Sequence, residues 1–388
     1  MTTLRLIYAA LGVASGLLFP YTSVMLMSHG LSVATIGLVF AVSAAVSVVA
    51  GPIWGHLADV VLGQRRALRL AILGSALAQV AFGLLAPPAA VAIAWVTFSA
   101  AFCAVGPLSD ALTLNALPTN RKGDFGGVRL FMSMAFAVTA ITTGFVFNVT
   151  GYGLAPLLTA ATYVIVAVLV GLLPDVPRAA LGDLGRRRGG SPRAALMHQR
   201  RLPLVLATMA IAGIGIGPAL SFMSVRIEQL GGSPSDIALA SGLDAVLEAP
   251  GFLLAAWAAS RIGVRGLYVV AGALMAACLV ALGLAGSPVA IIAVRTVMGL
   301  AFAGLILAPV ITMSVLLPAS LQGTGQMLGA TTGGIVGIVS NVAGGLIYGA
   351  YGASVLFLAG SACVAVAAFI AWFVLPGPVQ VRRVVGSE

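Results

Sequence analysis

Residues 55–66 read GHLADVVLGQRR and residues 256–265 read AWAASRIGVR, and each of these loops follows a long apolar run. A shift of 201 residues places Asp59 on Ser260 in these two loops. The same shift aligns three further pairs: Ile36 with Ile237, Gly144 with Gly345, and Gly151 with Gly352. One constant offset across several apolar runs predicts a chain built from two similar halves.

The composition indicates that most of the chain is surrounded by lipid and not by water. Of 388 residues, 60% are hydrophobic and only 8% are charged, against roughly a quarter charged in an ordinary soluble domain. The mean hydropathy is +1.11. Such a chain cannot hide its apolar surface from water, which excludes a soluble enzyme, a disordered chain and a disulfide scaffold. We expect an all-α membrane protein.

Apolar runs of about 20 residues, the length that spans a bilayer, can be counted twelve times. They lie at 4–28, 34–61, 68–86, 90–117, 126–149, 152–174, 203–227, 235–260, 265–285, 288–317, 321–349 and 351–375. The predicted domains are a six-helix bundle, a cytoplasmic linker, a second six-helix bundle and a cytoplasmic tail, at residues 1–174, 175–202, 203–377 and 378–388. Parallel halves of this kind place a solute site at their interface, near mid-membrane.

The basic residues predict the orientation. All but three of the 20 basic residues lie at the chain ends or in the gaps after the second, fourth, sixth and eighth runs. This positive-inside pattern predicts that both termini are cytoplasmic, in a plasma membrane. Arginines dispersed between spans do not form a nucleic-acid surface, so no nucleic-acid partner is expected.

The repeated loop resembles the signature of the major facilitator superfamily, Gly-x-x-x-Asp-Arg/Lys-x-Gly-Arg/Lys-Arg/Lys, and the resemblance covers the whole chain. It implies a gating loop in each half, at Gly55, Asp59, Gly63 and Arg65, and at Arg261, Gly263 and Arg265. The first copy lacks the basic residue after the Asp and has one extra residue before the glycine. The second copy has Ser260 in place of the Asp.

Two further stretches resemble the lactose-permease-like and phenylpropionate-permease-like branch of this superfamily. They are FGGVRLFMS at 125–133 and LEAP at 247–250. The resemblance implies proton-coupled import. Drug antiporters of the superfamily usually carry Gly-Pro-x-x-Gly-Gly in the fifth helix, where this chain reads TTGFVF at 142–147.

Ionisable residues inside spans are costly and therefore indicate function. Asp244 and Glu248 are four apart and share one helix face, at depths of ~14 and ~20 Å from the outer end. Burial and mutual repulsion disfavour two charged carboxylates there, so we expect proton coupling at this face. Arg295 enters its helix from the same side and lies ~11 Å deep, where it can pair with Asp244. A static ion pair between the two helices is the alternative.

A second charged locus is expected in the inner half of the membrane. Asp110 precedes the inner end of the fourth run and Arg129 follows the start of the fifth. We expect Asp110 to take part in proton coupling and Arg129 in solute binding, with snorkelling of Arg129 to the headgroups as the alternative. Arg295 and four neutral side chains are further candidate solute contacts, although a neighbouring helix can equally satisfy the neutral ones: Tyr21, Asn115, Gln326 and Asn341.

These features predict a secondary transporter that moves a small organic solute by alternating access, as a monomer and by proton symport. No nucleotide, metal or hydrolase motif is present, so we expect neither an enzyme nor a cofactor. Two alternatives stay open at this point. One is a proton-coupled efflux antiporter for drugs or a metabolite, and the other is a sensor or scaffold without transport activity.

Overall fold

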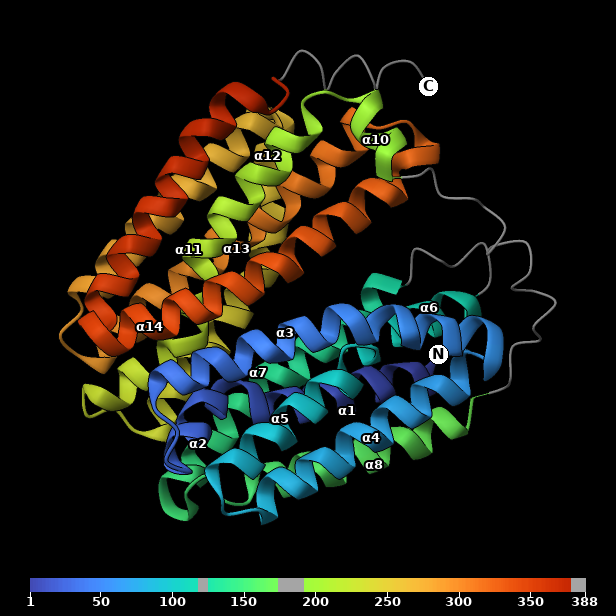
Figure 1. The fold of residues 1–388 in the computed structure, drawn as a ribbon, viewed down its shortest axis with the longest axis vertical. Coiled ribbons are helices and arrows are strands. Elements are labelled where there is room, and N and C mark those ends of the chain that lie inside the picture. The colour runs from blue at the N-terminus through green and yellow to red at the C-terminus, as the bar shows by residue number, and fades with distance from the viewer. Residues whose placement is uncertain (118–124, 174–191, 378–388) are drawn as a thin grey trace. The chain divides into compact units, whose positions relative to one another are not determined.

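The computed structural model describes residues 1–117, 125–173 and 192–377, and every regular element in these ranges is helical (Figure 1). The α-helices are α1 (Thr2–Leu18), α2 (Thr22–Ser28), α3 (Val33–His56), α4 (Gln64–Leu84), α5 (Pro88–Phe102), α6 (Val105–Ala116), α7 (Phe125–Thr150), α8 (Ala155–Gly171), α10 (Pro192–His198), α11 (Leu202–Gln229), α12 (Pro234–Leu284), α13 (Pro288–Leu316) and α14 (Ala319–Val374). Two short elements complete the set, the 3₁₀ turn η1 (Phe19–Tyr21) and the π-helical turn η2 (Leu57–Val61).

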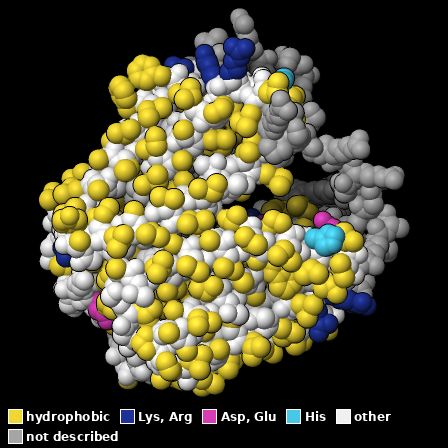
Figure 2. Space-filling view, viewed as in Figure 1, with side chains coloured by type: hydrophobic (Ala, Val, Ile, Leu, Met, Phe, Trp, Pro, Cys, Tyr) yellow, Lys and Arg dark blue, Asp and Glu magenta, His cyan; other side chains and the backbone are white. Residues whose placement is uncertain are grey.

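Nine stretches of the described chain are helical, apolar and long enough to cross a bilayer. Their surfaces are apolar too: the side chains of Leu77 and Val149 are 71% and 89% exposed. Figure 2 shows hydrophobic side chains over the helices of the face drawn, with Lys and Arg mainly near its margins. Such exposed apolar surface is stable only against another apolar phase, here lipid.

Two of the long helices contain a break at a glycine. Gly263 in α12 and Gly352 in α14 have φ of 73° and 83°, outside the helical region. With each of these two helices divided there, and with the shorter apolar α8 included, the described residues contain twelve helical segments of the predicted order. That each segment crosses the membrane stays a prediction.

Some of the predicted runs differ from the helices in detail. The first run contains α1, η1 and α2, because Pro20 follows α1 and has no N–H for continued helical bonding. The run predicted to begin at residue 68 begins as α4 at Gln64, since the arginines of the loop already lie in the helix. The linker predicted at 175–202 is described only from Pro192, where α10 forms. The predicted tail lies outside the described residues, as do Arg121, Lys122 and the arginines between 178 and 188.

The left-handed glycines show the internal repeat. The described chain has six residues with positive φ, and all are glycine. They form three pairs separated by 200 or 201 residues: Gly30 with Gly231, Gly63 with Gly263, and Gly151 with Gly352. Glycine adopts this backbone conformation at little cost, whereas other residues are strained there. The two halves of the sequence therefore share turns as well as residues.

The chain forms two compact units, which are described separately: Met1–Arg187 with Ile227–Gly242, and Arg188–Arg226 with Leu243–Glu388. In the first unit, α1 packs against α7 and α8, and α4 packs against α5 and α8 (Figure 1). The beginning of α12 also belongs to this unit. There the Asn148 side chain accepts a hydrogen bond from the Ser235 backbone N–H and donates one to Ser235 Oγ, each at 3.0 Å.

The second unit contains α10, α13 and α14 and most of α11 and α12. Small residues bring its helices together: Gly215 on α11 lies against Gly360 on α14, and Gly304 on α13 lies against Ala271 on α12. Small side chains allow such close approach in membrane bundles, where no hydrophobic force drives helices together. The predicted domain boundaries at 174 and 203 stay a prediction.

Candidate functional site

A buried ion pair joins two helices of the second unit. Arg295 Nη2 on α13 lies 2.8 Å from Asp244 Oδ2 on α12, and the two side chains are only 16% and 12% exposed. The structure therefore brings together the two residues whose depths along their helices predicted a pair. Removing one partner of such a pair leaves an uncompensated charge away from water, at a cost of about 3–5 kcal/mol.

Gly299 makes this approach of the helices possible. It lies one turn after Arg295, and a Cβ added there would lie 2.6 Å from the Asp244 carbonyl oxygen and 3.2 Å from Asp244 Oδ1. The same Cβ would lie 3.2 Å from the backbone nitrogen of Glu248. Only glycine fits this position without movement of a helix. Sequence reasoning did not identify it, because a glycine in an apolar run gives no sign of what it faces.

The second carboxylate of this face has a different environment. Glu248 lies one turn beyond Asp244, is half-buried, and forms no ion pair or side-chain hydrogen bond with any described residue. Asp244 Oδ1 is also buried without a hydrogen-bond partner among those residues. The cluster thus holds two carboxyl groups and one guanidinium. Its net charge is −1 when both carboxyls are ionised and zero when one of them carries a proton.

A second charged cluster lies in the first unit, on three helices. Arg129 Nη1 on α7 donates to Asp110 Oδ2 on α6 at 2.9 Å, and the buried Tyr8 on α1 donates to Asp110 Oδ1 at 2.6 Å. The Arg129 and Asp110 side chains are 58% and 30% exposed. Tyr8 was not predicted as a site residue, although it is a polar side chain in an apolar run, as Tyr21 is.

The four neutral candidates have different surroundings. Tyr21 is buried, donates to the Ala140 carbonyl at 2.9 Å and packs against Phe147. Asn115 donates to Gln64 Oε1 at 2.9 Å, and the exposed Gln326 donates to the Val310 carbonyl at 3.5 Å. Each of these three side chains thus has a hydrogen-bond partner on a neighbouring helix. That is one of the two roles expected for them, the other being contact with the solute. Asn341 alone of the four lines the cavity described below.

The two signature loops supply helix caps within their own units. Arg65 donates through Nη1 to the Leu173 carbonyl just beyond α8, and Arg265 Nε donates to the Leu375 carbonyl just beyond α14, at 2.9 Å. Cations are favourable at helix C-termini, where carbonyl groups lack partners. Arg261 lies over the Trp257 ring at 5.9 Å. The gating role of these residues stays a prediction.

The remaining loop residues are two glycines with a special backbone conformation, one further glycine and one exposed carboxylate. Gly63 and Gly263 take the positive φ described above, and Gly55 lies in the last turn of α3 with open space around it. Asp59 is exposed and lies in the π-helical turn η2. Such turns often occur at functional positions in helices.

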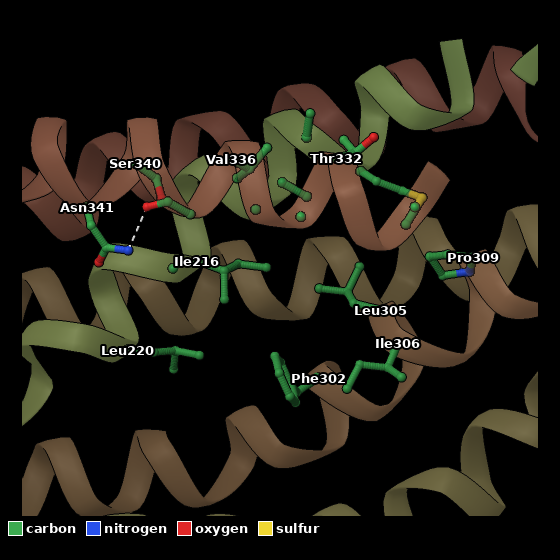
Figure 3. Close-up of a pocket in the computed structure, with 18 of the residues that line it drawn as sticks. Ile216, Leu220, Phe302, Leu305, Ile306, Pro309, Thr332, Val336, Ser340 and Asn341 are labelled. Carbon is green, nitrogen blue, oxygen red and sulfur yellow. Dashed lines mark hydrogen bonds between the residues drawn. The ribbon is translucent and has the colours of Figure 1, made fainter. Parts of the chain in front are cut away.

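A cavity of about 320 Å³ lies inside the second unit, lined by residues of α11, α12, α13 and α14. Ser340 and Asn341 lie at one end and Pro309 at the other, with Ile216, Val336, Phe302 and Leu305 between them (Figure 3). None of the cavity's described lining residues carries a formal charge. The described residues also contain no group of three or more His, Cys, Asp or Glu side chains that could hold a metal.

Comparison with known proteins shows the family. Residues 2–359 match the model of the MFS_1 like family. A maltose permease of Geobacillus stearothermophilus is 30% identical over 280 residues, which is 71% of this chain and 69% of the permease. Among solved structures, the nucleoside transporter NupG superposes with a TM-score of 0.82 at 16% identity, covering 96% of this chain and 98% of that one.

A second solved structure has the same fold. A bacterial homologue of the human lysosomal transporter Spinster, in an inward-facing and unoccupied conformation, has a TM-score of 0.74 at 14% identity, with 99% of this chain and 97% of the other covered. Together with the matched family model, these likenesses establish that the chain is a multi-pass membrane transporter and not an enzyme, and that it belongs to the MFS_1 like family of the major facilitator superfamily.

Proposed function

We propose that this chain is a secondary transporter that imports a small organic solute across the plasma membrane in symport with protons. It works by alternating access as a monomer, with both termini cytoplasmic. One observation carries the coupling: a buried Asp244–Arg295 ion pair lies beside a carboxyl group, Glu248, that has no partner among the described residues. A relative named maltose permease supports a small organic solute.

The charges of this cluster explain why a proton binds there. With both carboxyls ionised, one guanidinium faces two negative charges in a region poor in water, and the excess charge is unfavourable. A proton on Glu248 makes the cluster neutral without breaking the 2.8 Å pair. A neutral cluster is less costly to enclose during the change between outward- and inward-open states. Glu248 is therefore the proposed proton carrier, with Asp244 and Arg295 as its partners.

The cluster in the first unit is suited to the solute. Arg129 is more than half exposed while it is held by Asp110, and Tyr8 fixes the other carboxylate oxygen. An exposed guanidinium with unused N–H groups can bind hydroxyl or carboxylate oxygens of a solute. We assign solute binding to Arg129, and we assign to Asp110 the orientation of Arg129 and a share in proton movement.

The test measures proton movement in proteoliposomes with a trapped pH dye while sugars, nucleosides, organic acids and cationic drugs are added outside. Wild type is compared with Glu248→Gln and with Glu228→Gln, the same change at an exposed glutamate near the end of α11. We expect one solute class to carry protons inward in wild type and Glu228→Gln, and not in Glu248→Gln. Proton movement opposite to the solute would establish efflux, and solute binding without transport would contradict a transporter.

A further inference from the structure

The cavity of the second unit has a chemistry that differs from both charged clusters. Its 19 described lining residues are mostly aliphatic, aromatic or glycine, and four have polar side chains: Tyr268, Thr332, Ser340 and Asn341. The first two already have protein partners, because Thr332 Oγ1 donates to the Leu328 carbonyl at 2.8 Å and Tyr268 Oη donates to the Thr208 carbonyl at 3.5 Å. Among the four polar side chains that line the described cavity, unused hydrogen-bond donors therefore lie at the Ser340–Asn341 end, whereas Thr332 and Tyr268 can still accept.

At that end, one buried hydroxyl lacks a partner. Ser340 is 1% exposed, and its Oγ has no hydrogen-bond partner among the residues that the structure describes. Asn341 Oδ1 accepts from Ser221 Oγ at 3.0 Å. Asn341 Nδ2 donates to the Gly337 carbonyl at 2.7 Å (Figure 3). The amide nitrogen carries two hydrogens, of which this bond uses one. Buried polar groups normally have a partner, so a missing one indicates a ligand or a water.

The apolar lining of the rest of the cavity limits which other chemical groups the ligand can carry. Ile216, Val336, Phe302 and Leu305 offer no hydrogen bonds, so a solute with hydroxyl groups around its whole body would lose its hydration there without replacement. A charged group would meet no counter-ion. A volume of about 320 Å³ accommodates a ring system of modest size.

We propose that this cavity binds an uncharged, largely apolar portion of the transported solute, with one hydroxyl group hydrogen-bonded at Ser340 and Asn341. The inference rests on the proposed transport function and names the substrate class as a neutral amphipathic alcohol. Gly333 provides a way to test occupancy, because it lines the cavity and a Cβ added there meets no atom within 4 Å.

The experiment measures alkylation of Gly333→Cys by a small maleimide in the purified full chain, with mass spectrometry to separate position 333 from the three native cysteines. Three probes are compared. Naphthylethanol has the apolar ring and the single hydroxyl of the proposed ligand, naphthylacetate has the same ring with a charged group, and maltose has hydroxyl groups throughout. We expect naphthylethanol to slow alkylation at least tenfold, and the other two to slow it less than twofold. Gly106→Cys, in open space on α6, is the control that no probe protects.

A second variant tests the polar end. Ser340→Ala is expected to weaken protection by naphthylethanol roughly fivefold, the value of one hydrogen bond, and to leave protection by ethylnaphthalene unchanged. Equal loss for both probes, stronger protection by maltose, or no protection by naphthylethanol would overturn the assignment. Protection without proton movement would contradict the proposed coupling and leave the cavity assignment intact, so the two failures are distinguishable.

Discussion

The chain contains two Asp–Arg pairs of nearly equal length in different surroundings. Asp244 and Arg295 lie 2.8 Å apart with side chains 12% and 16% exposed, whereas Asp110 and Arg129 lie 2.9 Å apart at 30% and 58% exposure. The two residue types are the same and the distances differ by only 0.1 Å, so burial is the main difference between the pairs. An exposed pair contributes about 0–1 kcal/mol, and a buried one costs several times more to break.

This difference separates two tasks. The exposed guanidinium of Arg129 can change partners at little cost, as solute binding and release require. The buried pair is expensive to open, and its charge balance depends on whether the adjacent Glu248 carries a proton. In the proposed transport cycle, the exposed Asp110–Arg129 pair binds the solute. The buried Asp244–Arg295 pair responds to the protonation of Glu248.

The largest expected effect is on stability, from removal of the buried cation. Arg295→Ala should lower the free energy of unfolding by about 3–5 kcal/mol, because Asp244 is left charged and buried against α13. Arg129→Ala is the matched change in the exposed pair and should cost at most about 1 kcal/mol. Denaturant unfolding of both variants in detergent micelles measures this, and equal losses would remove the distinction between the pairs.

A smaller effect is expected where α12 meets α13. Gly299→Ala places a methyl group 2.6 Å from the Asp244 carbonyl oxygen, so the helices must separate, at about 1–3 kcal/mol. Gly333→Ala has open space around its new methyl group and should leave stability unchanged. The same unfolding measurement compares the two. Equal free energies of unfolding for Gly299→Ala and Gly333→Ala would show that the close approach of α12 and α13 at Gly299 does not stabilise the Asp244–Arg295 pair.

The smallest expected effect concerns the exposed pair and its third member. Tyr8→Phe removes the 2.6 Å hydrogen bond to Asp110, which should weaken apparent solute affinity about fivefold, or about 1 kcal/mol. The number of protons moved for each solute should stay the same. Tyr351→Phe, a change at a side chain that is 71% exposed, is the control. If Tyr8→Phe changed the number of protons moved for each solute, proton coupling would belong to the Tyr8–Asp110–Arg129 cluster and not to the cluster around Glu248.

The sequence predicted the features that depend on spacing along one helix or on the repeat. Asp244 and Glu248 share a face because they are four residues apart, and the positive-φ glycines recur at the offset found by alignment. The family and the helical membrane fold were predicted correctly from composition and the signature loops. Composition, spacing along one helix and the internal repeat can all be read from the sequence without knowing which helices are in contact.

Features that depend on which helices face each other could not be predicted. Tyr8 contacts Asp110 across 102 residues, and Gly299 faces Asp244 across 55. Apolar residues surround most spanning helices on every side, so no polar face indicates the neighbour. The cavity depends on four helices at once, and Ser340 in it resembles any other serine in an apolar run.

The most direct test of the account follows solute and proton together in the same proteoliposomes. For wild type, solute accumulation should fall as the external pH rises, because fewer protons are available to load Glu248. Glu248→Gln should still exchange labelled for unlabelled solute at every pH, without accumulating it and without moving protons. If Glu248→Gln accumulated solute and moved protons as wild type does, the proposed role of the buried cluster would be wrong.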